Sequence, residues 1–324
     1  RHEPALAAAP TAAVAGGVGC GCGRASAASP RAVPATPTAG HTPWPSPTPT
    51  ALVCSNATML ATWSLTRLAE QTLVVPVAET DVSSITTEIA AGAGGVILFG
   101  STAPSNLGTA LHTLEAAAPS GITPFVMTDE EGGVVQRMAN LVGSIPSARE
   151  MAATMTAAQI QALATTVGKR MRAAGVTMDL APVLDLDNGI GPNNQDPDGT
   201  RSFSLIATVA AADGTAFMAG LRAGGIVPVI KHFPGLGQAS RNTDVGPATT
   251  LPWSTLEHAG LLPFEQAINA GAPVVMVANA VVPGLSTRPA SISPAVIPRE
   301  LPEQLPPTSP VLPDPHPPKC STTR

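Results

Sequence analysis

Charged and polar residues gather in short runs of this 324-residue sequence, each directly after an apolar stretch. The first run covers residues 128–133, and Arg137 follows four residues later. A carboxylate such as Asp129, followed by Gly132 and Gly133, suits hydrogen bonding to ligand hydroxyl groups with a close approach of the backbone. The alternative is an acidic helix N-terminus in a turn.

A second run, residues 179–187, carries Asp185 and Asp187 at the end of an apolar stretch, and Arg201 stands in the segment that follows. Taken alone, two carboxylates at a strand end are compatible with a cation site or with a solvated loop. Both interpretations stay open on this pattern.

The third run, residues 231–237, is the most specific of the three. It begins with Lys231 and His232 and continues into a Pro/Gly-rich loop that reaches Asp244. This order places a cation and an imidazole beside a flexible loop that carries a carboxylate. The alternative for His232 is a core histidine with its hydrogen bonds satisfied.

Apolar strands alternate with helices around these runs. The pattern predicts strands at 73–77, 95–100, 124–129, 176–183, 226–231 and 274–278, and helices at 63–71, 85–91, 107–117, 157–174, 206–223 and 261–270. Such alternation indicates a parallel sheet covered by helices. We therefore predict an α/β fold, a (β/α)8 TIM-type barrel of which six of eight units are recognisable. The polar runs stand at the carboxyl ends of strands, where a barrel builds its site.

The C-terminal part of the sequence departs from this pattern. Nine prolines stand between positions 298 and 318, a density that forbids a central strand and a regular helix alike. Residues 298–324 are therefore predicted to be a disordered tail. We expect the barrel at 56–297 to be incomplete, with two strands missing.

The N-terminal part gives a second set of expectations. Arg1 and His2 precede an Ala/Val/Gly-rich stretch that ends at Cys20, so residues 1–23 resemble an export or lipoprotein signal remnant. A disordered Ala/Gly tail is an equal alternative. Residues 24–55 are rich in Pro, Ala and Thr and are predicted to be a linker. A secreted or envelope location follows, with Cys20 as the candidate membrane tether.

Composition excludes several classes of function. The net charge is -5 and no basic stripe is present, so nucleic acid is not an expected partner. No apolar run reaches the length of a membrane-spanning helix. The four cysteines lie outside the barrel region without zinc-site spacing. We expect no metal, no cofactor and a monomer.

Together and in this order, five runs resemble the N-terminal barrel of glycoside hydrolase family 3, in the branch of bacterial β-N-acetylglucosaminidases (β-N-acetylhexosaminidases) that includes envelope lipoproteins. These runs are 129–133 with Arg137, 181–185, 201–204, 231–237 and 289–293. By itself the last run indicates only a turn and a helix start. The resemblance covers about residues 63–297.

The resemblance implies a retaining mechanism with a covalent glycosyl-enzyme intermediate. It implies that the sugar is held by Asp129, Arg137, Arg201, Lys231 and His232. The implied activity is the removal of terminal N-acetylglucosamine from cell-wall-type glycans, such as peptidoglycan fragments. The loop after Gly237 would carry the acid/base.

Two departures from the family pattern concern catalysis. Asp244 stands where this branch carries a catalytic histidine, and it becomes the candidate acid/base. A carboxylic acid can take this role when its surroundings raise its pKa. The family nucleophile is an aspartate at the end of the seventh strand. Asp314 lies in the Pro-rich tail where no strand is predicted, so the nucleophile is left unassigned and treated as absent.

These departures leave two alternatives to a hydrolase: an inactive sugar-binding barrel and a non-functional truncated remnant. Without a nucleophile, acid–base help alone contributes only about 10²–10⁴-fold, against accelerations of about 10⁶-fold or more for enzymes. We therefore expect marginal stability, aggregation and little or no hydrolysis.

Overall fold

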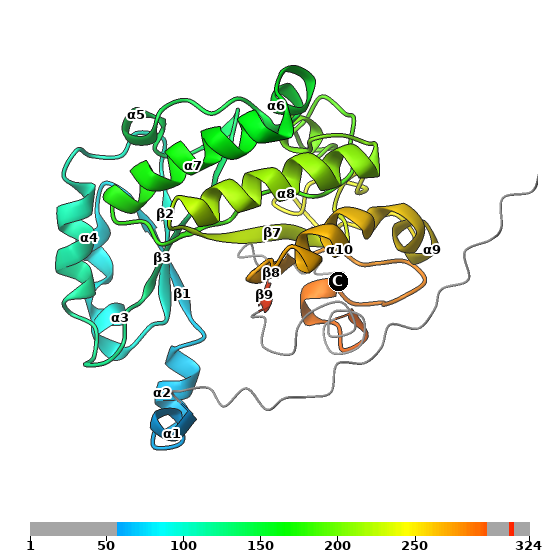
Figure 1. The fold of residues 1–324 in the computed structure, drawn as a ribbon. Helices are drawn as coiled ribbons and strands as arrows, with labels where there is room; N and C mark the ends of the chain where they lie inside the picture. Colours follow the sequence, from blue (N-terminus) through cyan, green and yellow to red (C-terminus); the bar gives the residue numbers. More distant parts are fainter. Residues whose placement is uncertain (1–56, 297–310, 314–324) are drawn as a thin grey trace, which may run out of the picture. The chain divides into compact units, whose positions relative to one another are not determined.

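A computed structural model describes residues 57–296 and 311–313. Its centre is a seven-stranded parallel sheet in the order β1-β2-β3-β6-β7-β8-β9 (Figure 1). The strands are β1 Val74–Ala78, β2 Gly95–Phe99, β3 Phe125–Thr128, β6 Met178–Asp179, β7 Val227–Phe233, β8 Val274–Val277 and β9 Val311–Pro313. Six of them follow one another along the chain with helical connections, so the predicted α/β fold of barrel type is confirmed.

Helices surround this sheet (Figure 1). They are α1 Ala57–Leu60, α2 Leu65–Glu70, α3 Thr86–Ala91, α4 Leu107–Glu115, α5 Ala139–Val142, α6 Ala148–Thr154, α7 Ala157–Ala173, α8 Ala207–Ala223, α9 Trp253–Thr255 and α10 Leu262–Asn269. No helix in the described part of the chain is both long and apolar enough to cross a membrane.

The two longest helices, α7 and α8, lie side by side. A reciprocal capping box between Thr156 and Gln159 starts α7. The two helices approach closely because glycine stands at their contact. A Cβ atom at Gly220 would lie 2.4 Å from the Gln161 carbonyl oxygen, too close for any other residue. The small residues of this sequence therefore set the helix spacing.

Successive residues of a strand point to opposite faces of the sheet, and β3 separates two cores in this way. Val126 belongs to the large core between sheet and helices, whereas Met127 belongs to a smaller apolar cluster. That smaller cluster also contains Met178, Val229 and Met276 from three other strands, so it fills the interior of the curved sheet. Asp129 continues on the interior side and Glu130 on the outer side.

One predicted strand is much shorter than expected. The pattern predicted residues 176–183, but β6 contains only Met178–Asp179. Pro182 has no N–H group and cannot continue the ladder toward β7. Pairing resumes beyond it, where Val183 forms a single bridge with Lys231.

A seventh strand was not expected from the sequence. Val311–Pro313 pairs in parallel with β8, with Met276 opposite Leu312 and Val277 opposite Pro313. β9 is an edge strand, and a proline there loses no hydrogen bond on the side of the strand that has no neighbour. The proline density therefore argues correctly against a central strand but not against an edge strand. Within the described residues β1 and β9 each pair with one strand, so the sheet is not closed. The predicted signal at 1–23, the linker at 24–55 and the other tail residues lie outside the described part.

Candidate functional site

A cavity of about 220 Å³ opens at the carboxyl ends of the strands. It is lined by all six residues that the sequence singled out: Asp129, Arg137, Arg201, Lys231, His232 and Asp244. Segments more than a hundred residues apart in the chain therefore meet in one place. The structure thus brings together the five residues that were expected to converge at one end of the sheet, and Asp244 lies beside them.

Ion pairs form the floor of this cavity. The Nζ atom of Lys231 lies 2.9 Å from Asp129 Oδ1 and 2.6 Å from Glu131 Oε1. Arg201 donates two hydrogen bonds of 2.8 Å to the two carboxylate oxygens of Glu131. This bidentate geometry fixes both side chains.

Glu131 is the residue of this network that the sequence did not single out. It was quoted within the acidic run, but no role was assigned to it. The signal was available in the strand period, because Glu131 stands two residues after Asp129 and so faces the same interior side. Its two cationic partners come from distant segments, and only the fold reveals them.

The ion pairs strongly favour the charged forms of Glu131, Arg201 and Lys231. Burial alone raises the pKa of Glu131, but the positive charges of Arg201 and Lys231 outweigh it and hold the pKa well below the usual range. Burial likewise opposes the charges on Arg201 and Lys231, yet the neighbouring carboxylates raise the pKa of both above their usual values. The cavity therefore offers fixed donors and acceptors to a polar ligand.

A second buried cluster supports His232 from behind. The Nδ1 atom of His232 lies 2.7 Å from Asp185 Oδ2, and Asp198 makes a side-chain hydrogen bond with Asp185. Burial and the charge of Asp185 raise the pKa of Asp198 well above its usual value, while burial raises the pKa of Asp185 to about 6. Asp198 Oδ1 also lies 3.4 Å from Arg201 Nη1, so this cluster is continuous with the ion pairs of the cavity.

The same three residues bring ligand-type atoms within 4.8 Å of one another, a spacing that a metal ion requires. Asp185 also accepts the backbone N–H groups of His232 and Leu236, the latter at 2.6 Å. Through these hydrogen bonds and the contact with Nδ1, Asp185 holds both the backbone and the ring of His232.

Asp185 and Asp187 do not form a solvated loop, which was one of the two interpretations that the sequence left open. Both are buried, and they accept backbone N–H groups from the loop after β7. Asp187 Oδ2 accepts from the Gln238 N–H at 2.9 Å. A Cβ atom at Gly237 would lie 2.2 Å from the Leu186 carbonyl oxygen, so the two loops are in direct backbone contact. The aspartates thus anchor the loop that carries Asp244.

The loop brings Asp244 to the edge of the cavity. Its backbone N–H donates to Asn242 Oδ1 at 2.9 Å, and the Asn242 N–H donates to the Asn194 carbonyl oxygen at 3.1 Å. Asp244 is exposed, whereas the neighbouring Thr243 is buried. An exposed carboxyl at the rim can approach a bound ligand from the solvent side.

The paired glycines after Glu131 have a structural role that differs from the one expected. Gly132 and Gly133 have φ angles of +100° and +59°, which glycine adopts readily. A Cβ atom at Gly132 would lie 2.3 Å from the Pro146 carbonyl oxygen. This close approach to the protein's own backbone requires glycine. The acidic run forms a β-hairpin, so the alternative of a helix N-terminus is wrong.

Asp314 gains a strand context from β9. This strand lies beside β8, whose Met276 lines the cavity, and Asp314 is the residue directly after its last member. Asp314 itself lies outside the described residues. The reason for leaving it unassigned, the lack of a strand before it, no longer holds.

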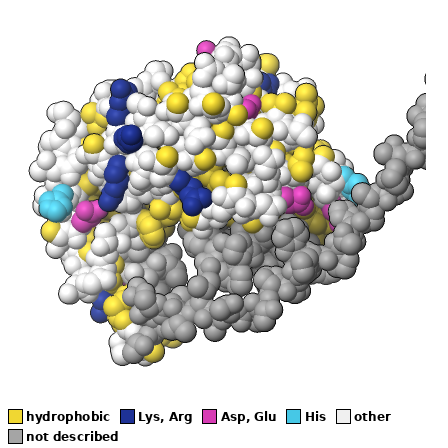
Figure 2. Space-filling model, viewed as in Figure 1, with side chains coloured by type: hydrophobic (Ala, Val, Ile, Leu, Met, Phe, Trp, Pro, Cys, Tyr) yellow, Lys and Arg dark blue, Asp and Glu magenta, His cyan; other side chains and the backbone are white. Residues whose placement is uncertain are grey.

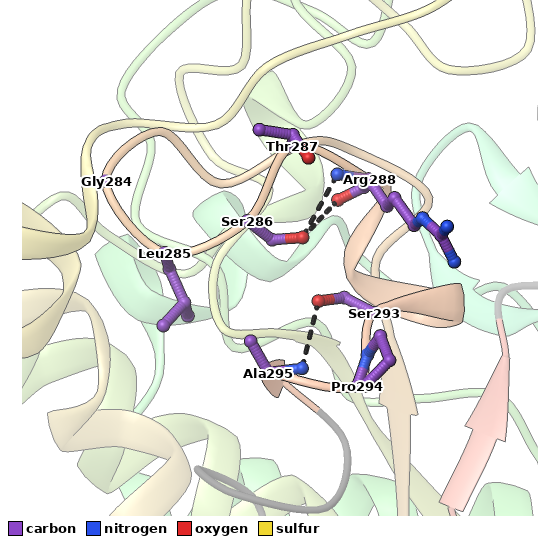
Figure 3. Close-up of a pocket in the computed structure, with 8 residues that line it drawn as sticks. All are labelled: Gly284, Leu285, Ser286, Thr287, Arg288, Ser293, Pro294 and Ala295. Carbon is purple, nitrogen blue, oxygen red and sulfur yellow. Dashed lines mark hydrogen bonds between the residues drawn. The ribbon is translucent and has the colours of Figure 1, made fainter.

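A larger cavity of about 570 Å³ lies in the loop after β8 (Figure 3). The Ser286 hydroxyl accepts the N–H of Arg288 and donates to its carbonyl oxygen, both at 3.0 Å. These polar groups of the cavity are therefore paired with one another. The run at 289–293 borders it and contains a short 3₁₀ helix, in keeping with the predicted turn and helix start. Its lining shows no buried ion network, so the smaller cavity is the stronger candidate site.

A parallel sheet wrapped by helices, with a charged cavity at the carboxyl ends of its strands, defines an enzyme-type (β/α)-barrel site. The chain matches the model of the glycosyl hydrolase family 3 N terminal domain over residues 71–306. It therefore belongs to this family, and the resemblance drawn from the sequence is confirmed.

Relatives with known names share parts of this chain. It is 40% identical over 190 residues to the beta-hexosaminidase LpqI of Mycobacterium tuberculosis, which covers 56% of this chain and 47% of that protein. It is 34% identical over 210 residues to a beta-hexosaminidase of Xylella fastidiosa, covering 61% and 60% of the two chains. The chain thus spans about half the length of these relatives.

Solved structures agree with this relationship. A GH3 family glycosyl hydrolase from Mycobacterium smegmatis aligns with a TM-score of 0.70 and 35% identity, covering 79% of this chain and 77% of that one. A β-N-acetylhexosaminidase from Beutenbergia cavernae aligns with a TM-score of 0.71 and 32% identity, covering 78% of each chain.

Proposed function

We propose that this chain is a glycosidase of the β-N-acetylhexosaminidase type that removes terminal β-linked N-acetylglucosamine from glycans. The observation that carries the proposal is the meeting of five sugar-holding side chains in one cavity, with Asp244 at its rim. Membership of glycosyl hydrolase family 3 and relatives named beta-hexosaminidase support it. The small cavity suits a single sugar unit, in keeping with exo action.

Each group has a distinct part in the proposal. Asp129 accepts hydrogen bonds from sugar hydroxyls, while Lys231 and Arg201 donate to sugar oxygens from positions fixed by Glu131. Arg137 has the most exposed charged group of the floor, with 27% of its side chain accessible, and it meets the sugar from the open side. Hydrogen bonds to charged groups contribute about 1.5–3 kcal/mol each.

The chemical step requires a proton donor and a nucleophile on opposite sides of the glycosidic bond, about 5 Å apart. Asp244 is the candidate acid, because it lines the rim from a separate loop. Glu131 is unsuited as nucleophile since both its oxygens are bound to cations. We assign this role to Asp314 as the carboxylate that directly follows the seventh strand.

The test is the release of 4-nitrophenol from its β-N-acetylglucosaminide by the purified chain. We expect slow release, well below about one turnover per second, because Asp244 replaces the histidine of this branch and prolines flank Asp314. Asp314→Asn should abolish this release and Asp244→Asn should reduce it. Glu257→Gln, a change of an exposed carboxylate on the outer side, should leave it unchanged. Release that persists in Asp314→Asn would place the nucleophile elsewhere.

Location and natural substrate are part of the same proposal. Cell-wall fragments in the envelope agree with the N-terminal stretch that ends at Cys20, which is the candidate lipid attachment point. Metabolic labelling of the expressed protein with an alkyne fatty acid should tag it, and Cys20→Ser should remove the label. Cys22→Ser is the matched control and should keep it. A label that follows Cys22 would contradict the assignment.

A further inference from the structure

Glu130 is the first residue of β4 (Glu130–Gly132), and its side chain lies on the side of the strand opposite to Glu131. Glu130 is completely buried. Its Oε1 atom accepts the backbone N–H of Arg137 at 2.6 Å and that of Met138 at 2.7 Å. This carboxyl group thereby holds together the ends of a hairpin formed by β4 (Glu130–Gly132) and β5 (Val135–Gln136).

The hairpin carries Arg137 to the cavity. The other two cations of the floor are fixed by ion pairs of 2.6–2.9 Å, whereas Arg137 Nη2 lies 3.7 Å from Asp129 Oδ2. Its guanidinium also lies over the ring of Phe99, 5.5 Å from the centroid. These side-chain contacts are weaker than those of Lys231 and Arg201. The placement of Arg137 therefore depends more on its backbone.

The same residue ties the hairpin to the sheet. The backbone N–H of Glu130 donates to Asp179 Oδ1 at 2.9 Å, and Asp179 is a completely buried residue of β6. Glu130 thus connects the strand β6 through its backbone and the segment 137–138 through its side chain. A buried hydrogen-bonded carboxyl at such a junction fixes geometry, because leaving its partners unsatisfied costs free energy.

We propose that Glu130 is a positioning residue that sets the backbone of Arg137 and so determines how well the arginine reaches the sugar. The proposal rests on the proposed function of the cavity. Glu130 touches no ligand, and it acts through Arg137. The length of the side chain matters more than its charge, because the N–H groups of Arg137 and Met138 need an acceptor at a fixed distance.

The test compares two substitutions by titration calorimetry with N-acetylglucosamine. Glu130→Asp keeps the carboxyl group and shortens the side chain by one methylene, so it should weaken binding about tenfold. Glu130→Gln keeps an acceptor oxygen at the same reach and should bind within about threefold of wild type. Val134→Ala, in the exposed turn of the same hairpin, is the matched control and should bind normally. Normal binding by Glu130→Asp would overturn the proposal.

A double-mutant cycle separates positioning from general loosening of the fold. In an Arg137→Ala background, Glu130→Asp should weaken binding no further, because its effect passes through the missing guanidinium. An equal loss in both backgrounds would overturn the proposal in favour of a structural role.

Amide hydrogen exchange gives a readout that does not depend on sugar binding. The Arg137 and Met138 amides should exchange faster in Glu130→Asp than in wild type and Glu130→Gln. If wild type binds no N-acetylglucosamine, the proposed function fails, and this exchange then decides the role of Glu130 alone. Unchanged exchange at both amides would refute that role.

Discussion

At the scale of single residues, the site is a set of buried charges that hold one another. Lys231 lies between Asp129 and Glu131, and Glu131 also binds Arg201. Removing one member of a buried ion network leaves its partners charged in a poorly solvated place. The side chains to which we assign sugar binding are therefore also needed for stability.

Lys231→Met tests this dependence. The substitution keeps the apolar length of the side chain but leaves two carboxylates facing each other, so the free energy of unfolding should fall by about 3–5 kcal/mol. Urea denaturation followed by circular dichroism measures it. Lys169→Met, a change of an exposed lysine on α7, should have little effect. A loss below about 1 kcal/mol for Lys231→Met would show that the network is not tightly coupled.

The raised pKa of Glu130 predicts that the stability of the protein depends on pH. Burial raises its pKa from the ordinary value of 4.5 to about 7, although the N–H groups of Met138 and Arg137 partly oppose this. The folded protein therefore holds this proton more tightly than the unfolded chain. Its contribution to stability is fully present below about pH 4.5 and is lost as the pH rises through about 7.

Glu130→Gln cannot ionise, and the comparison with wild type isolates this group from Asp185, whose pKa burial also raises, to about 6. The free energy of unfolding of Glu130→Gln relative to wild type should increase by about 3 kcal/mol between pH 4.5 and 7. Urea titrations at several pH values measure it. A difference that stays constant across this interval would contradict the raised pKa.

At the scale of elements, the loop after β7 is held by two aspartates from the loop after β6. Asp187→Ala removes the acceptor of the Gln238 N–H and should loosen the segment that carries Asp244. Amide exchange over residues 236–245 should become faster, and turnover should fall. Asp81→Ala, a change of an exposed aspartate before α3, is the control. Unchanged exchange would mean that the loop is held by other contacts.

The elements also show how far the sequence could lead. Apolar runs located six strands, because buried parallel strands read as continuous apolar segments, although β6 is much shorter than predicted. The β4–β5 hairpin was missed since its short strands carry charges and glycines whose partners lie elsewhere in the fold. β9 was missed because proline density was weighed as if every strand were central.

The residues of the site also divide into those that the sequence predicted and those that it missed. The five residues to which the family resemblance gives a sugar-holding role meet in one cavity. Glu131, Glu130 and Asp198 were not singled out, because their importance comes from burial and from partners more than forty residues away or across a loop. Residue type and spacing identify groups that face a ligand more readily than groups that support them.

At the scale of the whole molecule, the described sheet leaves two strands with one neighbour each. Large apolar side chains are also exposed, including Leu65 at 83% and Leu73 at 56%. The face shown in Figure 2 carries few charged side chains among apolar and uncharged atoms. Unpaired edges and apolar surface favour association between molecules.

Aggregation should therefore respond to surface charge. Leu65→Lys together with Leu73→Lys should raise the temperature at which light scattering increases, because charge discourages apolar contact and strand addition. Binding of N-acetylglucosamine should not change, since neither residue lines the cavity. Thr113→Lys together with Thr166→Lys, at exposed threonines of α4 and α7, adds the same two charges and controls for net charge. Equal protection by this control would point to net charge alone.

Titration calorimetry tests most directly whether the cavity at the strand ends binds N-acetylglucosamine through its ion network, as we propose. Wild type should bind N-acetylglucosamine, and Asp129→Ala should abolish detectable binding. A buried sugar hydroxyl would then lose its charged partner, which contributes about 1.5–3 kcal/mol. Asp81→Ala should bind like wild type. No binding by a folded wild-type chain, or equal binding by folded Asp129→Ala, would contradict the claim.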